Sequence, residues 1–129
     1  MTAGYSGTPL PRKLGIKPGH RVLLLGAPEG FALDLPEGVT EADGEADVIL
    51  AFHTRRDELA AAIPALRARM EKAAGLWIAW PKRASKMETD LTEDVVRELA
   101  LANTLVDNKV CAIDETWSGL RLVIRLKDR

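Results

Sequence analysis

The chain has 129 residues, of which 47% are hydrophobic and 29% charged, as expected for one soluble globular domain with its own core. Its formal net charge of -1 excludes a general electrostatic attraction to nucleic acid or to an anionic membrane. The N-terminus has no apolar run typical of a signal peptide, no stretch is long enough to span a bilayer, and the single cysteine excludes an internal disulfide, so we expect a cytoplasmic protein.

Residues 1–19 are predicted to form an N-terminal arm, and residues 20–129 a single α/β domain. The arm is rich in Gly, Pro and basic residues and has one short helical stretch, Pro9–Leu14, ended by Gly15. The segment Gly4–Thr8 resembles the turn that carries a hydrolase serine, but no strand precedes it. We therefore expect it to be a flexible lid or arm.

Two strands follow the arm. Arg21–Leu25 is a continuous apolar run that predicts a buried strand, and it opens into the loop Gly26–Gly30. Residues 31–46 carry only a weak apolar signal and predict one helical turn or an irregular excursion. Asp47–Phe52 is the second predicted strand, placed parallel to the first.

A helix and the central strand come next. Thr54 is a candidate cap for this helix, which we expect to kink at Pro64 and to end at Gly75. The strand Gly75–Trp80 is apolar throughout, as in a strand covered on both faces, and Pro81 ends it. The helix face predicted to be buried consists of Leu59, Ile63, Leu66 and Met70.

The last third predicts a helix and a hairpin. Asp90 is the predicted N-cap of the helix, with Glu93 three residues on as its capping-box partner. Strands are expected at about Val106–Ile113 and Leu120–Lys127, and so short a connection makes them antiparallel. The chain therefore predicts a three-layer, Rossmann-like α/β fold with a mostly parallel sheet of about five strands that ends in an antiparallel hairpin.

This order of elements resembles the second half of the Rossmann-like sheet of S-adenosylmethionine-dependent methyltransferases. A second resemblance, to the short bacterial proteins called domain of unknown function 3052, covers nearly the whole chain. It implies a small free-standing cytoplasmic protein and supplies no activity or site residue. Its motifs are Gly4–Leu10, Lys13–Ile16, Ala27–Phe31, Trp80–Lys82, Thr89–Glu93 and Val110–Gly119.

The loop Gly26–Gly30 departs from the dinucleotide-binding pattern Gly-x-Gly-x-x-Gly. The second glycine is missing, Pro28 removes a phosphate-binding N–H, and Glu29 adds a negative charge. The stretch after the loop also leaves no room for a second strand that ends in the acid needed to hold a ribose. We therefore expect no cofactor, neither NAD nor S-adenosylmethionine.

Metal and thiol chemistry are not expected either. The residues His20, His53 and Cys111 lack any metal-ligand spacing, so no metal site is predicted. Cys111 lies within a predicted strand and is interpreted as a small buried hydrophobic residue.

One candidate site remains, at the edge where the carboxyl ends of the parallel strands and the turn of the hairpin meet. Lys82 and Arg83, with Lys86 nearby, would hold a phosphate or carboxylate, while Asp114 or Glu115 would serve as a base and Trp117 as a stacking wall. For each single residue the alternative is a solvated loop charge, or for Trp117 packing on the hairpin. The candidate ligand-binding residues are His53, Trp80, Lys82, Arg83, Asp114, Glu115, Trp117 and Ser118, with Glu29 and Arg55 at the same edge.

Three functional hypotheses follow. The leading one is a non-enzymatic binding or regulatory module for a small anionic ligand. The second is a small enzyme that acts on an anionic metabolite through His53, Lys82 and Asp114 or Glu115, and the third is a structural or interaction subunit. Binding of nucleic acid and of membrane is not expected.

Assembly depends on the edge of the sheet. Val22–Leu25 is expected at an edge, where an apolar strand needs cover by residues 1–19, by residues 31–40 or by another subunit. We favour cover by the chain itself, as a monomer, with a homodimer as the alternative.

Overall fold

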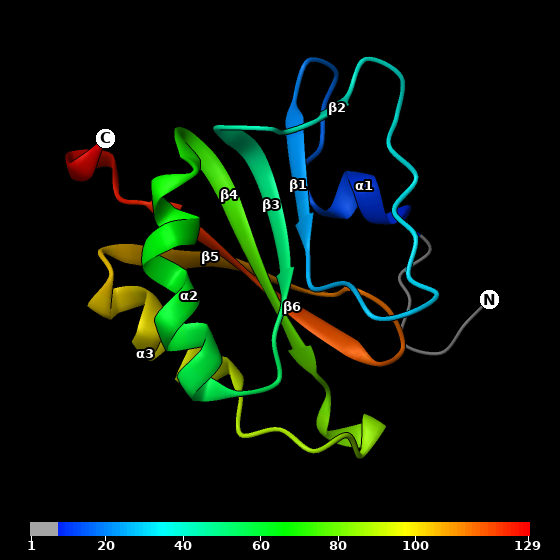
Figure 1. The fold of residues 1–129 in the computed structure, drawn as a ribbon, viewed down its shortest axis with the longest axis vertical. Helices are drawn as coiled ribbons and strands as arrows, with labels where there is room; N and C mark the ends of the chain where they lie inside the picture. The colour runs from blue at the N-terminus through cyan, green and yellow to red at the C-terminus, as the bar shows by residue number, and fades with distance from the viewer. Residues whose placement is uncertain (1–7) are drawn as a thin grey trace.

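A computed structural model describes residues 8–129 of the protein, which form one six-stranded sheet (Figure 1). The first four strands in spatial order are parallel, and the last two form an antiparallel pair. The predicted fold class is confirmed, with six strands in place of about five. In spatial order they are β2 (Thr40–Glu41), β1 (Arg21–Leu25), β3 (Ala46–Phe52), β4 (Met70–Pro81), β6 (Trp117–Ile124) and β5 (Leu105–Ala112).

Strand β4 lies in the middle of the sheet, parallel to β3 on one side and antiparallel to β6 on the other. Its residues from Ala74 to Pro81 are all buried, which explains the unbroken apolar run in the sequence. The strand begins at Met70, five residues before the predicted start. Gly75 therefore lies inside the strand and does not end the preceding helix.

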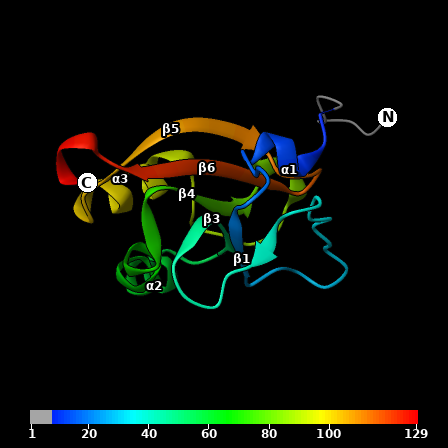
Figure 2. The ribbon, with the colours of Figure 1, turned by 90° about the horizontal axis from the view of Figure 1, so that it is seen from above.

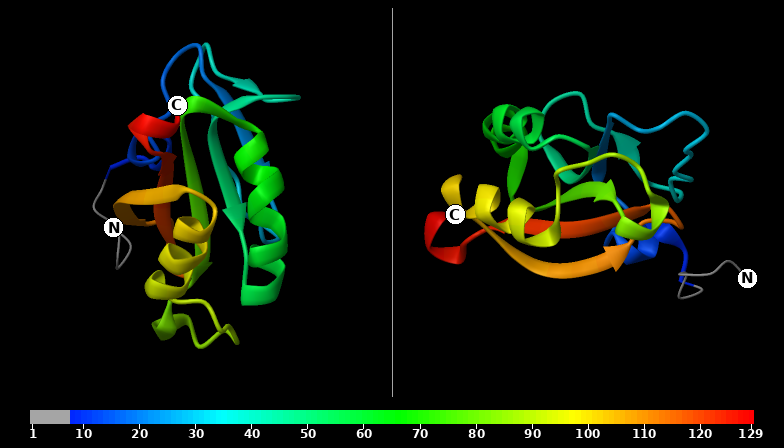
Figure 3. Two further views of the ribbon diagram at one scale, coloured as in Figure 1. Left: turned by 90° about the vertical axis from the view of Figure 1, so that its left-hand side faces the viewer. Right: turned by 90° about the horizontal axis from the view of Figure 1, so that it is seen from below.

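Helices α2 (Arg56–Ala68) and α3 (Glu93–Ala102) cover one face of the sheet (Figures 1 and 3). The opposite face carries α1 (Leu10–Lys13) and the chain between β1 and β2 (Figure 2). Each face has its own apolar cluster, with Ile49, Leu76 and Ile78 on the α2 side and Leu50, Trp77 and Ala79 on the α1 side. Consecutive residues alternate between the two clusters because side chains of a strand point to opposite faces.

Helix α2 differs from its prediction in three ways. It runs through Pro64 as one element, and because Pro64 is exposed, its ring and missing N–H face solvent. Leu59, Ile63 and Leu66 are buried as expected, whereas Met70 belongs to β4. Arg55 is the N-cap, without a side-chain cap bond, in place of the predicted Thr54.

The start of α3 is also corrected. Its N-cap is Thr92, whose hydroxyl accepts a hydrogen bond from the Val95 N–H at 3.2 Å. Asp90 instead accepts a hydrogen bond from the Arg56 N–H at 2.7 Å and so satisfies the start of α2. The predicted capping box fails because the segment before α3 folds back over α2, where the Thr89 hydroxyl donates to the Thr54 carbonyl at 2.6 Å.

The predicted helix in the N-terminal arm is confirmed at Leu10–Lys13. Leu14 and Ile16 after it are buried, and the Trp77 indole N–H donates to the Leu14 carbonyl at 3.1 Å. These contacts hold residues 10–16 against the sheet. The predicted lid at Gly4–Thr8 lies, apart from Thr8, outside the described residues. Within residues 8–129 no helix has the length and apolar character needed to cross a membrane.

The terminal hairpin is confirmed, with its second strand three residues earlier than predicted. At the other end of the sheet, β2 pairs with β1 for only two residues, Arg21↔Thr40 and Val22↔Glu41. Beyond this pair, Leu24 and Leu25 are 36% and 37% exposed. Two short 3-10 turns, η1 (Arg83–Ser85) and η2 (Leu126–Asp128), follow β4 and β6.

Candidate functional site

The carboxyl ends of β1, β3 and β4 share one edge of the sheet, as predicted, because these strands are parallel. The hairpin turn reaches the same edge, where the Lys82 N–H donates to the Thr116 carbonyl at 2.8 Å. The His53 N–H donates to the Ala79 carbonyl at 2.9 Å. Backbone hydrogen bonds thus bring the predicted loops together.

The sheet nevertheless separates the two predicted tryptophans. Trp80 is buried in the cluster on the α2 side, and Ser118 is its partner on the neighbouring strand β6. Trp117 is only 6% exposed and lies in the cluster on the α1 side, so the predicted stacking wall is wrong. Its ring packs edge-on against the ring of Phe52, with 5.1 Å between the ring centroids. The Phe52 ring packs in the same way against Phe31, with 4.9 Å between the centroids.

Asp114 shapes the hairpin turn. One of its carboxylate oxygens accepts hydrogen bonds from the N–H groups of Thr116 and Trp117, both at 2.8 Å. This is the turn-forming role that Asp often has, in which the side chain bonds backbone two or three residues ahead. Glu115 next to it is exposed. The catalytic base predicted at Asp114 is therefore a turn residue in this arrangement.

A cavity of about 410 Å³ lies where β4 ends, between η1 and the first turn of α3. The exposed Arg83 lines it together with Glu93, whose carboxylate binds Arg97 at 2.6 Å. Lys82 is not among the lining residues, so the two adjacent cations point to different places. The cavity is lined by Trp80, Pro81, Arg83, Met87, Thr89, Leu91, Thr92 and Glu93.

His53 is half-buried and does not line this cavity. Its burial lowers the pKa of the imidazole, and the nearby Glu58 partly opposes that effect. His53, Arg83 and Asp114 thus share an edge of the sheet without forming one compact site.

A second cavity, of about 260 Å³, runs along the outer edge of β1. We call it the β1 groove. It contains one ionisable side chain, that of Glu41, the last residue of β2. No second strand that ends in an acid is expected in this stretch, and β2, which ends at Glu41, shows that this expectation is wrong. The groove is lined by Val22, Leu23, Leu24, Leu33, Leu35, Glu41 and Ala42.

The groove was missed because β2 has only two residues and no apolar pattern. The signal that was available is the acidic run from Glu29 to Asp47, which contains seven acids and no base. It was interpreted as a solvated surface segment, while Leu33 and Leu35 within it pack against the core.

Gly26 sets the course of the chain from β1 into this region. Its φ of 67° lies in the left-handed range, and a Cβ at this position would stand 2.9 Å from the Phe52 carbonyl oxygen. Only glycine allows the loop to pass this close to the end of β3. The first glycine of the loop is therefore required by the fold, whatever binds there.

No family model and no curated protein matches this chain, so the resemblance to domain of unknown function 3052 is not confirmed. Solved structures do match. One is a ribosomal protein L11 methylase from Lactobacillus delbrueckii subsp. bulgaricus, with a TM-score of 0.57 and 12% identity over 90% of this chain and 75% of that chain. Another is the fibrillarin pre-rRNA processing protein of Methanococcus jannaschii, with a TM-score of 0.56 and 14% identity over 91% and 69%.

The chain also matches the magnesium protoporphyrin IX methyltransferase of Synechocystis PCC 6803 with bound S-adenosylmethionine. The TM-score is 0.51 at 14% identity, and the match covers 65% of this chain and 41% of that chain. This chain therefore spans less than half the length of that methyltransferase.

These neighbours contradict the leading functional hypothesis and its preference for a protein without enzymatic activity. The solved structures that share the fold include methyltransferases, one with bound S-adenosylmethionine. At such low identity the likeness establishes the architecture alone. The chain has the Rossmann-like fold of methyltransferases.

Proposed function

We propose that the protein is an enzyme of the methyltransferase type that binds S-adenosylmethionine along β1. The observation that carries this proposal is the β1 groove, in which four leucines surround the single carboxylate of Glu41. A purine needs an apolar surface, and a ribose diol needs an acceptor for its two hydroxyls. The groove supplies both from adjacent elements of the sheet.

The length of the groove suits an extended ligand. Glu41 is level with Val22, and Leu24, the last lining residue of β1, is two residues further along the strand, about 7 Å away at the rise of a strand. The nucleoside would lie between Glu41 and Leu24, with the methionyl part toward Gly26. When bound, the cofactor supplies an electrophilic methyl group on a sulfonium centre.

The charge of the loop supports this cofactor over NAD. Glu29 and the acids that follow it repel a pyrophosphate, and the charge of Glu29 is one of the reasons to expect no dinucleotide. S-adenosylmethionine has no phosphate, and its sulfonium and ammonium groups are cationic. The same acidic segment therefore attracts it.

The acceptor substrate is assigned to the cavity beside Arg83. Arg83 is exposed and would hold an anionic group of the acceptor through two parallel hydrogen bonds. Lys82 lies at the same edge and would add to the local positive potential, whereas His53, whose pKa is lowered by burial, would be a neutral hydrogen-bonding group. In this proposal Arg83 positions the acceptor and takes no part in cofactor binding.

Family membership, bacterial origin and cytoplasmic location are also proposals. The motif Val110–Gly119 supports membership in the family of domain of unknown function 3052, and with it a bacterial origin. A single cysteine, half-buried at Cys111, fits a reducing cytoplasm.

Calorimetric titration tests the proposed cofactor. The protein should bind S-adenosylmethionine more tightly than S-adenosylhomocysteine, which lacks the sulfonium charge, and should not bind NAD. Glu41→Gln should weaken binding about tenfold or more, since a hydrogen bond to a charged group is worth about 1.5–3 kcal/mol.

Glu37→Gln is the matched control, because Glu37 is an exposed acid of the same segment that does not line the groove. It should change the affinity by less than about threefold if only long-range charge is altered. Equal effects of the two substitutions, or no binding of S-adenosylmethionine, would rule out the proposed site.

A further inference from the structure

The amino edge of the sheet carries a second site of opposite charge. A cavity of about 390 Å³ lies there on the α1 face, lined by residues that precede β1 and by residues of α1, β5 and β6. We call it the basic pocket. Lys13, Lys17, Lys109 and Arg121 line it together with His20, and no acid of the described residues does. Residues 1–25 of the sequence contain no acid at all, so the N-terminal segment has no carboxylate to supply.

Arg121 is the central residue of the pocket. It lies on β6 opposite Trp77 of β4 and Lys109 of β5. It is half-buried, and within residues 8–129 its guanidinium has no hydrogen bond or ion pair. Burial lowers its pKa, and the nearby Arg129 adds to this effect. A half-buried guanidinium without a counter-ion keeps its N–H donors available for an anion.

The fold makes room for this side chain. A Cβ on Gly75 would stand 2.5 Å from Nε and 2.9 Å from Cζ of Arg121. The guanidinium thus occupies the space that a side chain at position 75 would fill, where it crosses the surface of β4. Arg21 is neutralised by Asp47 at 3.0 Å and Arg97 by Glu93 at 2.6 Å, whereas Arg121 has no such acid within residues 8–129.

Lys109 is held next to Arg121 by a neutral partner. The Lys109 ammonium donates to the Lys13 carbonyl at 3.3 Å, and the Lys13 ammonium donates to the Ala112 carbonyl at 2.8 Å. A carbonyl oxygen orients an ammonium and leaves its charge in place, and each ammonium has three donors. The bond to the Lys13 carbonyl therefore orients the Lys109 ammonium without neutralising it.

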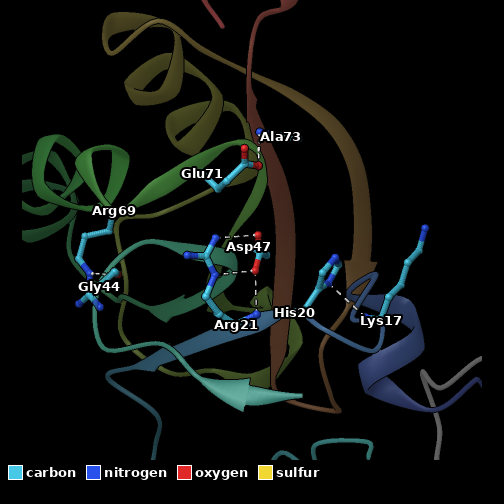
Figure 4. A network of polar contacts seen from close by, with 8 residues as sticks. All are labelled: Lys17, His20, Arg21, Gly44, Asp47, Arg69, Glu71 and Ala73. Carbon is cyan, nitrogen blue, oxygen red and sulfur yellow. Dashed lines mark hydrogen bonds and ion pairs between the residues drawn. The ribbon is translucent and has the colours of Figure 1, made fainter. Parts of the chain in front are cut away.

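Two acids at the amino edge of the sheet already accept hydrogen bonds from other groups. Asp47 binds Arg21 through both of its oxygens, and Glu71 accepts the Ala73 N–H at 2.8 Å (Figure 4). His20 and Lys17 lie beyond them, where His20 Nδ1 accepts the Lys17 N–H at 3.1 Å (Figure 4). Neither acid lines the pocket.

We propose that the basic pocket binds a small, multiply charged phosphate-bearing anion. Arg121 would hold one phosphate through two parallel hydrogen bonds, and Lys109, Lys13 and Lys17 would act as point charges around it. The pocket lies at the opposite end of the parallel strands from Gly26 and from the cavity beside Arg83. The site is therefore independent of the proposed methyl transfer.

The test uses inorganic pyrophosphate as the probe, titrated calorimetrically into the full-length protein. Arg121→Gln and Lys109→Gln should each weaken binding about tenfold or more, as expected for the loss of hydrogen bonds to a charged group. Lys127→Gln, which removes an exposed charge outside the pocket, should change the affinity less than about threefold. Gly75→Ala should also weaken binding although it leaves every charge in place, because its methyl displaces the Arg121 side chain.

A second measurement guards against misfolded variants. The indole N–H of Trp77 donates to the carbonyl of Leu14, which lines the pocket. In ¹⁵N-resolved spectra of the wild type, the Trp77 indole signal should therefore shift on addition of pyrophosphate. The Arg121→Gln protein should unfold at the same temperature as the wild type in the absence of anion, because the half-buried Arg121 makes no ion pair within residues 8–129 whose loss would cost stability. Absence of pyrophosphate binding, equal affinity in the Arg121→Gln and wild-type proteins, or binding only of long polyanions such as heparin would each overturn the proposal.

Discussion

Gly119→Ala is predicted to destabilise the fold through packing alone. Gly119 lies in β6 opposite Ala79 of β4 and Cys111 of β5, and its φ lies outside the left-handed range. A Cβ there would stand 2.7 Å from Cδ1 and 3.0 Å from Cγ1 of Ile113, and 3.2 Å from Cε3 of Trp77. Because carbon atoms pack at about 3.5–4.0 Å, the neighbours must move by about 1 Å.

Neither neighbour can move freely. Ile113 and Trp77 are fully buried, Ile113 is branched at Cβ, and the Trp77 indole is held by its bond to the Leu14 carbonyl. Forcing a methyl group into such a site costs about 1–3 kcal/mol. For a domain of this size that lowers the melting temperature by about 3–15 °C.

Thermal and urea unfolding monitored by circular dichroism measure this cost. Gly44→Ala is the control, because nothing lies within 4 Å of the Cβ it would add. The double variant Gly119→Ala/Ile113→Val removes the Cδ1 atom that the new methyl meets first and should lose less stability than the sum of the two single changes. Equal stability of the Gly119→Ala and Gly44→Ala proteins, or strict additivity in the double variant, would refute the packing argument.

Three further predictions concern single side chains. Thr92→Ala should cost about 1 kcal/mol in urea unfolding, because the Val95 N–H at the start of α3 loses its cap. Asp47→Asn should destabilise the protein at pH 7. The hydrogen bond from Arg21 holds the pKa of Asp47 below its usual value, so its stabilisation is present above the unfolded-state pKa of about 3.9 and is lost as the pH falls through the lower folded-state value. The difference in the free energy of unfolding between the wild type and the Asp47→Asn protein should therefore decrease below about pH 4. A constant difference down to about pH 2 would contradict this reasoning. Because burial raises the pKa of the Cys111 thiol, iodoacetamide should modify it at pH 8 more slowly than it modifies free cysteine, and equal rates would show that the thiol is accessible and ionised.

The sheet could be predicted from sequence because its strands are long apolar runs. Leu23–Leu25, Val48–Phe52 and Leu76–Trp80 each exceed what a solvated loop would carry, and the terminal hairpin is set by its short connection. Strand β2 could not be predicted, because its two residues are polar and its place depends on pairing with β1. Tertiary contacts also decided the capping roles, since Asp90 is close in sequence to α3 and close in space to the start of α2.

The candidate sites could be predicted from the sequence only in part. Sequence order placed the correct loops at the carboxyl edge, but the faces to which Trp80 and Trp117 point depend on register. The β1 groove and the basic pocket combine residues from distant segments, such as Leu33 with Glu41 and Lys13 with Arg121. The one sequence signal for the β1 groove and the basic pocket is the uneven distribution of charge, which is basic up to residue 25 and acidic from residue 29 to residue 47.

The most direct test of the account is an amide titration of the full-length protein with S-adenosylmethionine, followed by ¹⁵N-resolved spectra. The proposed binding mode predicts that the backbone signals of Leu23, Leu24, Gly26 and Glu41 shift in a saturable way, while those of Lys109 and Arg121 at the opposite edge stay in place. Absence of any shift at millimolar cofactor, or shifts confined to residues outside the β1 groove, would contradict it.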